Sequence, residues 1–113
     1  MTFYTSYFAR SCNHPNALSI SCSVPKWYNG RQNKLVAPSW ELVNGIKSGT
    51  ITREEYTKTY LAKLNRLGVD KVISTLQDGD VLLCWEASGD FCHRHILAEW
   101  LRQYGHTVTE IGG

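Results

Sequence analysis

The sequence predicts an α/β fold, with a small parallel or mixed sheet and helices packed on it. Three observations support this prediction. Residues 81–85 are continuously apolar, as in a strand that is covered on both faces at the centre of a parallel sheet. A helical pattern and then a Thr- and Val-rich segment, residues 106–111, complete a strand-helix-strand unit. The middle of the chain has helical patterns between two strand-forming ends, and 113 residues suit a single domain.

The first two strands are predicted near the start of the chain. Residues 3–8 are rich in aromatic side chains, and in residues 18–22 apolar side chains alternate with serines. Residues 25–38 lack periodicity, so we expect an irregular connection that is long enough to be a lid or a binding loop. We expect Trp27 and Tyr28 in this connection to be buried anchors rather than a stacking platform, because large aromatic side chains are usually buried.

Three helices are predicted in the middle of the chain. Ser39 is a suitable N-cap for the first, which is short. Thr52 and Glu55 have the spacing of a capping box, and the second helix that they begin should end at Gly68. Residues 69–76 show one apolar face and predict the third helix.

The last predicted helix follows the apolar strand at residues 81–85 and a polar loop. Its apolar side is centred between Leu97 and Trp100, and a helical rotation of 100° per residue places His93 on that side. Arg94 falls at the flank of the apolar side, and His95 falls on the opposite side. We therefore expect His93 and Arg94 to face the sheet and His95 to face solvent.

The start of this helix is a predicted anion site. If Asp90 is the N-cap, Cys92 and His93 occupy the second and third helical positions, where backbone N–H groups without helical partners collect. An anion there would also be held by the guanidinium of Arg94, which suits phosphate or carboxylate. In open α/β sheets, ligands bind at the carboxyl ends of the strands, where this loop should lie.

Catalysis at this site has two candidate residues. The same position would favour the thiolate form of Cys92, as a nucleophile requires, although its spacing from Arg94 is not that of the Cys-x5-Arg phosphatase loop. Glu86 should lie beside the crevice, where a carboxylate can act as a general base or nucleophile in glycosidic-bond chemistry. Alternatively, Glu86 only orients His93 or Arg94.

A metal or redox role for the cysteines and histidines is a further alternative. Zinc could be held by Cys84, Cys92 and His93 with a distant Cys12 or His14, but the paired Cys-x2-Cys spacing of structural zinc sites is missing. The sequence therefore predicts no metal site and no cofactor.

Composition limits the partners and the location. Twelve Lys and Arg against ten Asp and Glu give a net charge of +2, which is too small to favour a nucleic-acid partner. The best support for nucleic-acid binding is the presence of Trp27, Tyr28 and Arg31 in one loop. No apolar run approaches the length of a membrane span, and no secretion signal accompanies the four cysteines. We therefore expect a cytoplasmic protein with reduced thiols.

The chain resembles the DUF488 family of bacterial and phage-encoded α/β proteins. The main likeness is the segment LLCWEASGDFCHRHILAEWL, which resembles that family's C-[YFW]-E…C-H-R signature. Further support comes from FYTSYFAR, VAPSWEL and ITREEYTKTYLAKL. The resemblance covers nearly the whole chain and implies one Rossmann-like domain over residues 1–113.

The resemblance also implies a pocket, without supplying a reaction. The residues that it gathers there are Cys84, Glu86, Cys92, His93 and Arg94, with Ser6 and Arg10 from the first strand. Our leading prediction is the binding of a phosphorylated or nucleotide-like small molecule, which the protein would sequester or process. The alternative is a hydrolase or transferase that acts on a glycosidic or phosphate bond through Glu86 or Cys92.

Overall fold

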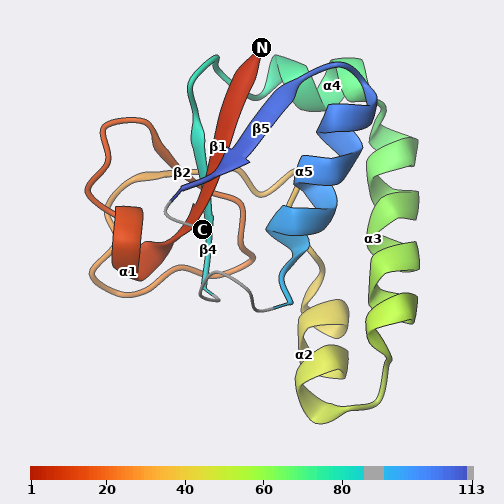
Figure 1. Ribbon diagram of the computed structural model, residues 1–113. Coiled ribbons are helices and arrows are strands. Elements are labelled where there is room, and N and C mark those ends of the chain that lie inside the picture. The colour runs from red at the N-terminus through yellow and green to blue at the C-terminus, as the bar shows by residue number, and fades with distance from the viewer. Residues whose placement is uncertain (86–90, 112–113) are drawn as a thin grey trace.

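The fold is described by a computed structural model that covers residues 1–85 and 91–111. These residues form a five-stranded sheet and five helices (Figure 1). In chain order the elements are β1 (Thr2–Tyr7), α1 (Phe8–Ser11), β2 (Ala17–Ser19), β3 (Arg31–Gln32), α2 (Trp40–Ser48), α3 (Arg53–Leu67), α4 (Val69–Ser74), β4 (Val81–Cys84), α5 (His93–Gln103) and β5 (Thr107–Glu110). The predicted α/β fold is confirmed.

All strands of the sheet are parallel, in the order β3-β2-β4-β1-β5. The strand β4 is central, and all four of its residues are buried, which explains why its sequence is continuously apolar rather than alternating. Helices α3 and α5 cover one face of the sheet, and α1 lies on the other side with the loops around β2 (Figure 1). The sheet is therefore covered on both faces.

The connections that follow the neighbouring strands β1 and β4 run in opposite directions. These strands pair side by side, with Tyr7 opposite Cys84. The chain leaves β1 past β4 to reach β2, and it leaves β4 through α5 and past β1 to reach β5. In open α/β sheets, ligands commonly bind at the carboxyl ends of the strands.

Local sequence signals account for most helix boundaries. The Ser39 hydroxyl accepts a hydrogen bond from the amide of Leu42 at the start of α2. The predicted capping box is present at the start of α3, where Thr52 and Glu55 bond reciprocally. In the described part of the chain, no helix is long and apolar enough to cross a membrane.

Two short elements and one aromatic side chain differ from the predictions. The one-turn α1 was not predicted, and β3 lies inside the segment that was expected to be irregular, because its two residues pair with β2. Tyr28 is buried and its hydroxyl donates to the carbonyl of Arg31, which confirms it as an anchor. Trp27 is 57% exposed, so the same prediction was wrong for this residue.

Candidate functional site

The helix α5 begins at His93, later than predicted. Cys92 is its N-cap, with an extended backbone at φ −154° and ψ 146°. The predicted N-cap, Asp90, lies outside the described residues, and the placement of Cys92 and His93 at the second and third helical positions was wrong. The sulfur of Cys92 is bonded to that of Cys84 at the end of β4, and we attribute the later helix start to this link.

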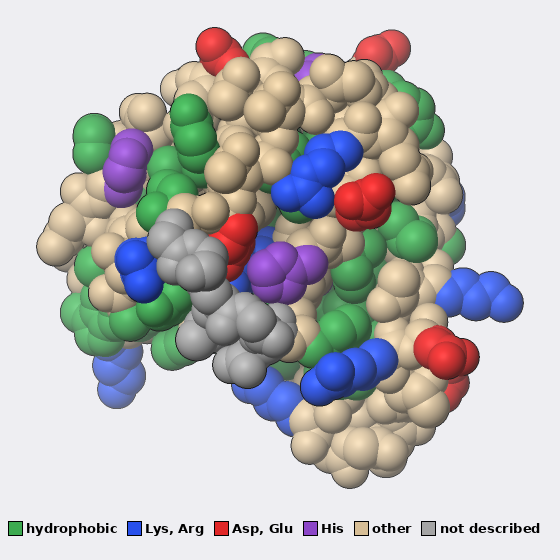
Figure 2. Space-filling view, viewed as in Figure 1, with side chains coloured by type: hydrophobic (Ala, Val, Ile, Leu, Met, Phe, Trp, Pro, Cys, Tyr) green, Lys and Arg blue, Asp and Glu red, His purple; other side chains and the backbone are tan. Residues whose placement is uncertain are grey.

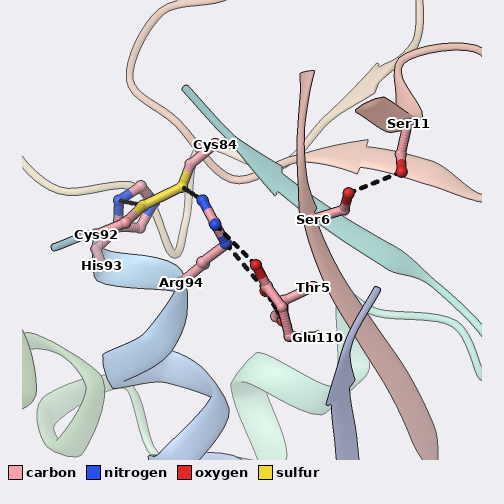
Figure 3. Close-up of polar contacts among 8 residues, drawn as sticks. All are labelled: Thr5, Ser6, Ser11, Cys84, Cys92, His93, Arg94 and Glu110. Atoms are coloured by element: carbon pink, nitrogen blue, oxygen red, sulfur yellow. Dashed lines mark hydrogen bonds and ion pairs between the residues drawn. A yellow bond between two sulfur atoms is a disulfide. The ribbon is translucent and has the colours of Figure 1, made fainter. Parts of the chain in front are cut away.

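Cys84 and Cys92 form a disulfide (Figure 3). Cys12 and Cys22 are free. The expectation of reduced thiols was therefore wrong for the first pair. The fold places the sulfurs of these two cysteines together, at the end of β4 and immediately before α5. In this oxidised state the sulfur of Cys92 is not available as a thiolate nucleophile.

Arg94 is fully buried and connects three elements. Its Nε and Nη2 donate to the two carboxylate oxygens of Glu110 on β5, at 3.2 and 2.8 Å. Its Nη1 donates to the sulfur of Cys84 at 2.8 Å, and Thr5 on β1 donates to Glu110 at 2.5 Å (Figure 3). The prediction that Arg94 faces the sheet is confirmed, and its guanidinium contacts a carboxylate of the chain itself.

His93 is buried beside the disulfide. Its Nε2 lies 2.7 Å from the carbonyl oxygen of Ile20, and its Nδ1 lies 3.7 Å from the sulfur of Cys92. Burial lowers the pKa of His93 to about 4, against the opposing effect of the Ile20 hydrogen bond and with a further lowering by Arg94 and Lys63. The imidazole is therefore neutral near pH 7, and its inward orientation is as predicted.

Of the remaining predicted residues, Ser6 lies apart from this cluster, whereas Arg10 and Arg94 both lie near the ring of Tyr7. Ser6 is buried and shares a hydrogen bond of 2.7 Å with Ser11, away from Arg94 (Figure 3). Arg10 is exposed, with its guanidinium 5.7 Å from the centre of the Tyr7 ring. Glu86 lies outside the described residues. The structure thus brings together Cys84, Cys92, His93 and Arg94, but not Ser6.

A cavity of about 210 Å³ adjoins the cluster on the side of α2 and α3. Its lining comes from the segment after β2, from α2 and α3, and from the two sides of the β4–α5 connection. Its walls include the aromatic rings of Trp40, Tyr56, Trp85 and Phe91. Cys92 and His93 also line it, so the disulfide and the imidazole lie at its wall.

Two kinds of residue around the cluster were missed by sequence reasoning. Trp40 and Tyr56 were not predicted as site residues, because helical spacing does not distinguish a ring that lines a cavity from one in the core. Ser21 also lines the cavity, and it is 4% exposed with no hydrogen-bond partner for its hydroxyl within the described residues. Glu110 was missed because its contact with Arg94 depends on the strand order.

A comparison with known families supports the resemblance found in the sequence. The family model DUF488-N3a, described as "Active DUF488-N3 subclade", matches residues 11–105. The chain belongs to the DUF488 family. The DUF488 match includes the disulfide, His93, Arg94 and the cavity walls, and it begins after Ser6 and Arg10. No curated protein and no solved structure matches the chain.

Proposed function

We propose that the protein binds a phosphorylated, nucleotide-like small molecule at the carboxyl edge of the sheet. The observation that carries this proposal is the aromatic cavity next to the start of α5. Trp40 and Trp85 are 54% and 50% exposed, so their faces are accessible to a flat ring. Stacking on aromatic side chains is a common way to hold a nucleobase, and it is tolerant of base identity.

Polar and basic groups around the cavity suit the rest of such a ligand. The buried hydroxyl of Ser21 can hydrogen-bond the edge of a ring. Lys47 lines the cavity, and the guanidinium of Arg53 lies 5.2 Å from the centre of the Phe91 ring. Figure 2 shows Lys and Arg side chains spread over this face of the molecule, some of them toward its lower end. We place the phosphate near these two cations and the first amides of α5.

Arg94 has a different part in this proposal. The predicted contact of Arg94 with the ligand stays a prediction. In the structure the guanidinium of Arg94 is buried against Glu110 and Cys84. The geometry supports a positioning role, in which Arg94 fixes the start of α5 relative to β4 and β5. The positive charge for the phosphate would then come first from Lys47 and Arg53.

A second candidate is an enzyme at the same site, a hydrolase or transferase that acts on a glycosidic or phosphate bond. The word "Active" in the family description favours it, as does the 3.7 Å separation of the Cys92 sulfur and the His93 Nδ1. Catalysis by Cys92 would require reduction of the disulfide. Catalysis by Glu86 predicts that Glu86→Gln retains binding and loses turnover.

We also propose a cytoplasmic location, and the family resemblance implies a bacterial or phage context. Disulfides in the cytosol are typically redox-active or catalytic rather than structural. The Cys84–Cys92 bond would then be one that the cell can break and re-form.

The binding proposal is tested with the wild-type protein in its oxidised state. Calorimetry and thermal shift are measured with AMP, ADP, cyclic nucleotides and ADP-ribose, and with adenosine and inorganic phosphate as the two separate halves of a nucleotide. We expect at least one nucleotide to bind more tightly than either half. If no compound gives heat or raises the Tm, the proposal is wrong. Mass spectrometry of the recovered compound then shows whether it was cleaved.

A further inference from the structure

We propose that Cys84, Cys92 and His93 bind one divalent ion of the zinc class when the disulfide between the two cysteines is reduced. Two thiolates and one imidazole are the donors that such borderline-soft ions prefer. All three residues are at most 5% exposed, and they come from the end of β4 and the start of α5. This site is independent of the proposed nucleotide binding, and it uses three residues of the zinc alternative in the sequence analysis, without the distant Cys12 or His14.

The donor atoms are close enough to share one ion. The two sulfurs and the nearer nitrogen of His93 lie within 4.8 Å of one another. The sulfur of Cys92 and the Nδ1 of His93 are 3.7 Å apart. Ligands at zinc–sulfur and zinc–nitrogen distances on a tetrahedral ion are separated by roughly 3.5 Å, so this pair already has a suitable spacing.

The hydrogen bond of His93 orients the imidazole for metal binding. The carbonyl of Ile20 can only accept, so the Nε2 of His93 must carry the proton and donate across 2.7 Å. In the neutral imidazole the lone pair is then on Nδ1, which faces the sulfur of Cys92. Metal-binding histidines usually donate their second ring nitrogen to a carbonyl or carboxylate in this way.

The charges at the site also balance. Two thiolates neutralise a divalent ion, and the guanidinium of Arg94 is neutralised by Glu110 at 2.8 Å. The Nη1 of Arg94 donates to the sulfur of Cys84, and this bond would stabilise the thiolate form. Among the described residues, a loaded site would therefore bury no net charge, which avoids the main cost of burying ions.

Binding requires a defined redox step. A dithiol reductant would transfer two electrons and two protons to the disulfide, which becomes two thiols while the reductant becomes a disulfide. The incoming ion then displaces both protons and holds the two sulfurs apart as thiolates. Because Cys92 and His93 line the cavity, the ion would lie at the cavity wall. Its remaining position would be open to water or a ligand, as in zinc sites with three protein ligands.

The first test compares oxidised and reduced protein. The protein is reduced with dithiothreitol, desalted under nitrogen and titrated with Zn²⁺ in competition with a chromophoric chelator. We expect one ion per reduced chain and none per oxidised chain. Titration with Co²⁺ should give the thiolate-to-cobalt charge-transfer absorption of a tetrahedral site. Failure of the reduced protein to compete with the chelator, or equal binding by the oxidised protein, overturns the proposal.

Variants assign the ligands. Cys84→Ser and Cys92→Ser should abolish binding, and His93→Gln should weaken it by more than about tenfold. Cys12→Ser and Cys22→Ser are matched controls, because their sulfurs are free in the structure, and both should bind Zn²⁺ like wild type. Loss of binding in either control together with retention in Cys84→Ser would place the ion elsewhere and overturn the proposal.

A second measurement needs no variant. Alkylation of the reduced wild-type protein, followed by peptide mass spectrometry, gives the reaction rate of each thiol with and without Zn²⁺. We expect the ion to slow the alkylation of Cys84 and Cys92 by at least tenfold and to leave Cys12 and Cys22 unchanged. Equal rates with and without Zn²⁺ contradict the site. The nucleotide assay uses oxidised, metal-free protein, so its outcome is independent of this one.

Discussion

The two sides of the Cys84–Cys92 disulfide differ in how their polar groups are satisfied. On the β5 side, Arg94 is paired with Glu110 and with the sulfur of Cys84, and Thr5 adds a further hydrogen bond. On the α2 side lies a cavity with aromatic walls, where the hydroxyl of Ser21 has no partner within the described residues. The first region is closed by the chain's own side chains, and the second leaves room for another molecule.

This contrast predicts that substitutions in the two regions change different properties, namely the stability of the fold and the affinity for a ligand. A buried charge whose partner is removed is costly, whereas an exposed ring that is removed from a cavity wall changes few internal contacts. We therefore expect substitutions in the Arg94–Glu110 region to lower the free energy of unfolding. Substitutions in the cavity should instead lower ligand affinity. The following predictions test this separation, beginning with the largest effect.

Glu110→Ala should destabilise the fold by about 3 to 5 kcal/mol, because it leaves the buried guanidinium of Arg94 without this carboxylate. Urea denaturation gives the free energy of unfolding. Glu99→Ala is the matched control, because Glu99 pairs with Arg102 at the surface, where an ion pair contributes at most about 1 kcal/mol. Equal effects of the two substitutions would show that Glu110 does not neutralise a buried charge.

The pH dependence of stability should identify His93. Its pKa is lowered from 6.5 to about 4 in the folded protein, so the unfolded chain takes up a proton first as the pH falls. The contribution of His93 to the free energy of unfolding is therefore fully present above pH 6.5. It declines by about 3 kcal/mol as the pH falls toward 4. Urea denaturation at pH 7 and pH 4.5 measures the decline.

His93→Gln should remove this part of the decline, while carboxylates continue to contribute their own. His14→Gln serves as the control, because His14 is exposed, and it should retain the wild-type pH dependence. The assignment to His93 would be contradicted by an unchanged decline in His93→Gln.

Trp40→Ala should weaken nucleotide binding by about 1 to 3 kcal/mol and change the free energy of unfolding by less than about 0.5 kcal/mol. Trp27→Ala provides a close control. Trp27 is 57% exposed against 54% for Trp40, but in the described structure it does not line the cavity. Calorimetry and urea denaturation of both variants measure the two effects. A similar loss of affinity in both would place the ligand outside the cavity.

Ser21→Ala should give the smallest change in stability and in nucleotide affinity among these substitutions. The hydroxyl of Ser21 has no partner within the described residues, so its removal should leave stability unchanged or slightly higher. Affinity for a nucleotide should fall by about 0.5 to 1.5 kcal/mol if the hydroxyl bonds the ring edge. Calorimetry that shows unchanged affinity would remove Ser21 from the binding site and leave the aromatic walls as its basis.

The sequence predicted those parts of the fold that depend on local signals. The capping box at Thr52 and Glu55 starts α3, and the apolar run of β4 indicated a central strand. The elements α1 and β3 were missed because four and two residues are too short for a periodic pattern. The inward orientation of His93 and Arg94 followed from helical rotation alone.

The site was less predictable because its contacts join distant segments. Glu110 meets Arg94 because β5 lies beside β1, and this strand order is not visible in the sequence. The cavity depends on rings that come from α2, α3 and both sides of the β4–α5 connection. The pairing of Cys84 with Cys92 depends on how the end of β4 lies against the start of α5, and neither spacing nor charge specified it.

The pairing of β1 has a consequence for the time course of folding. This strand pairs with β4 and β5, so Tyr4 lies opposite Val81, and Thr5 bonds Glu110 across 105 positions of sequence. Helix α3 contacts α2 and α4, which are its neighbours along the chain. Contacts between distant residues carry the larger loop-closure cost and form slowly. We therefore expect the helices to form early and the carboxyl edge of the sheet to be completed late, so that ligand binding reports the last stage of folding.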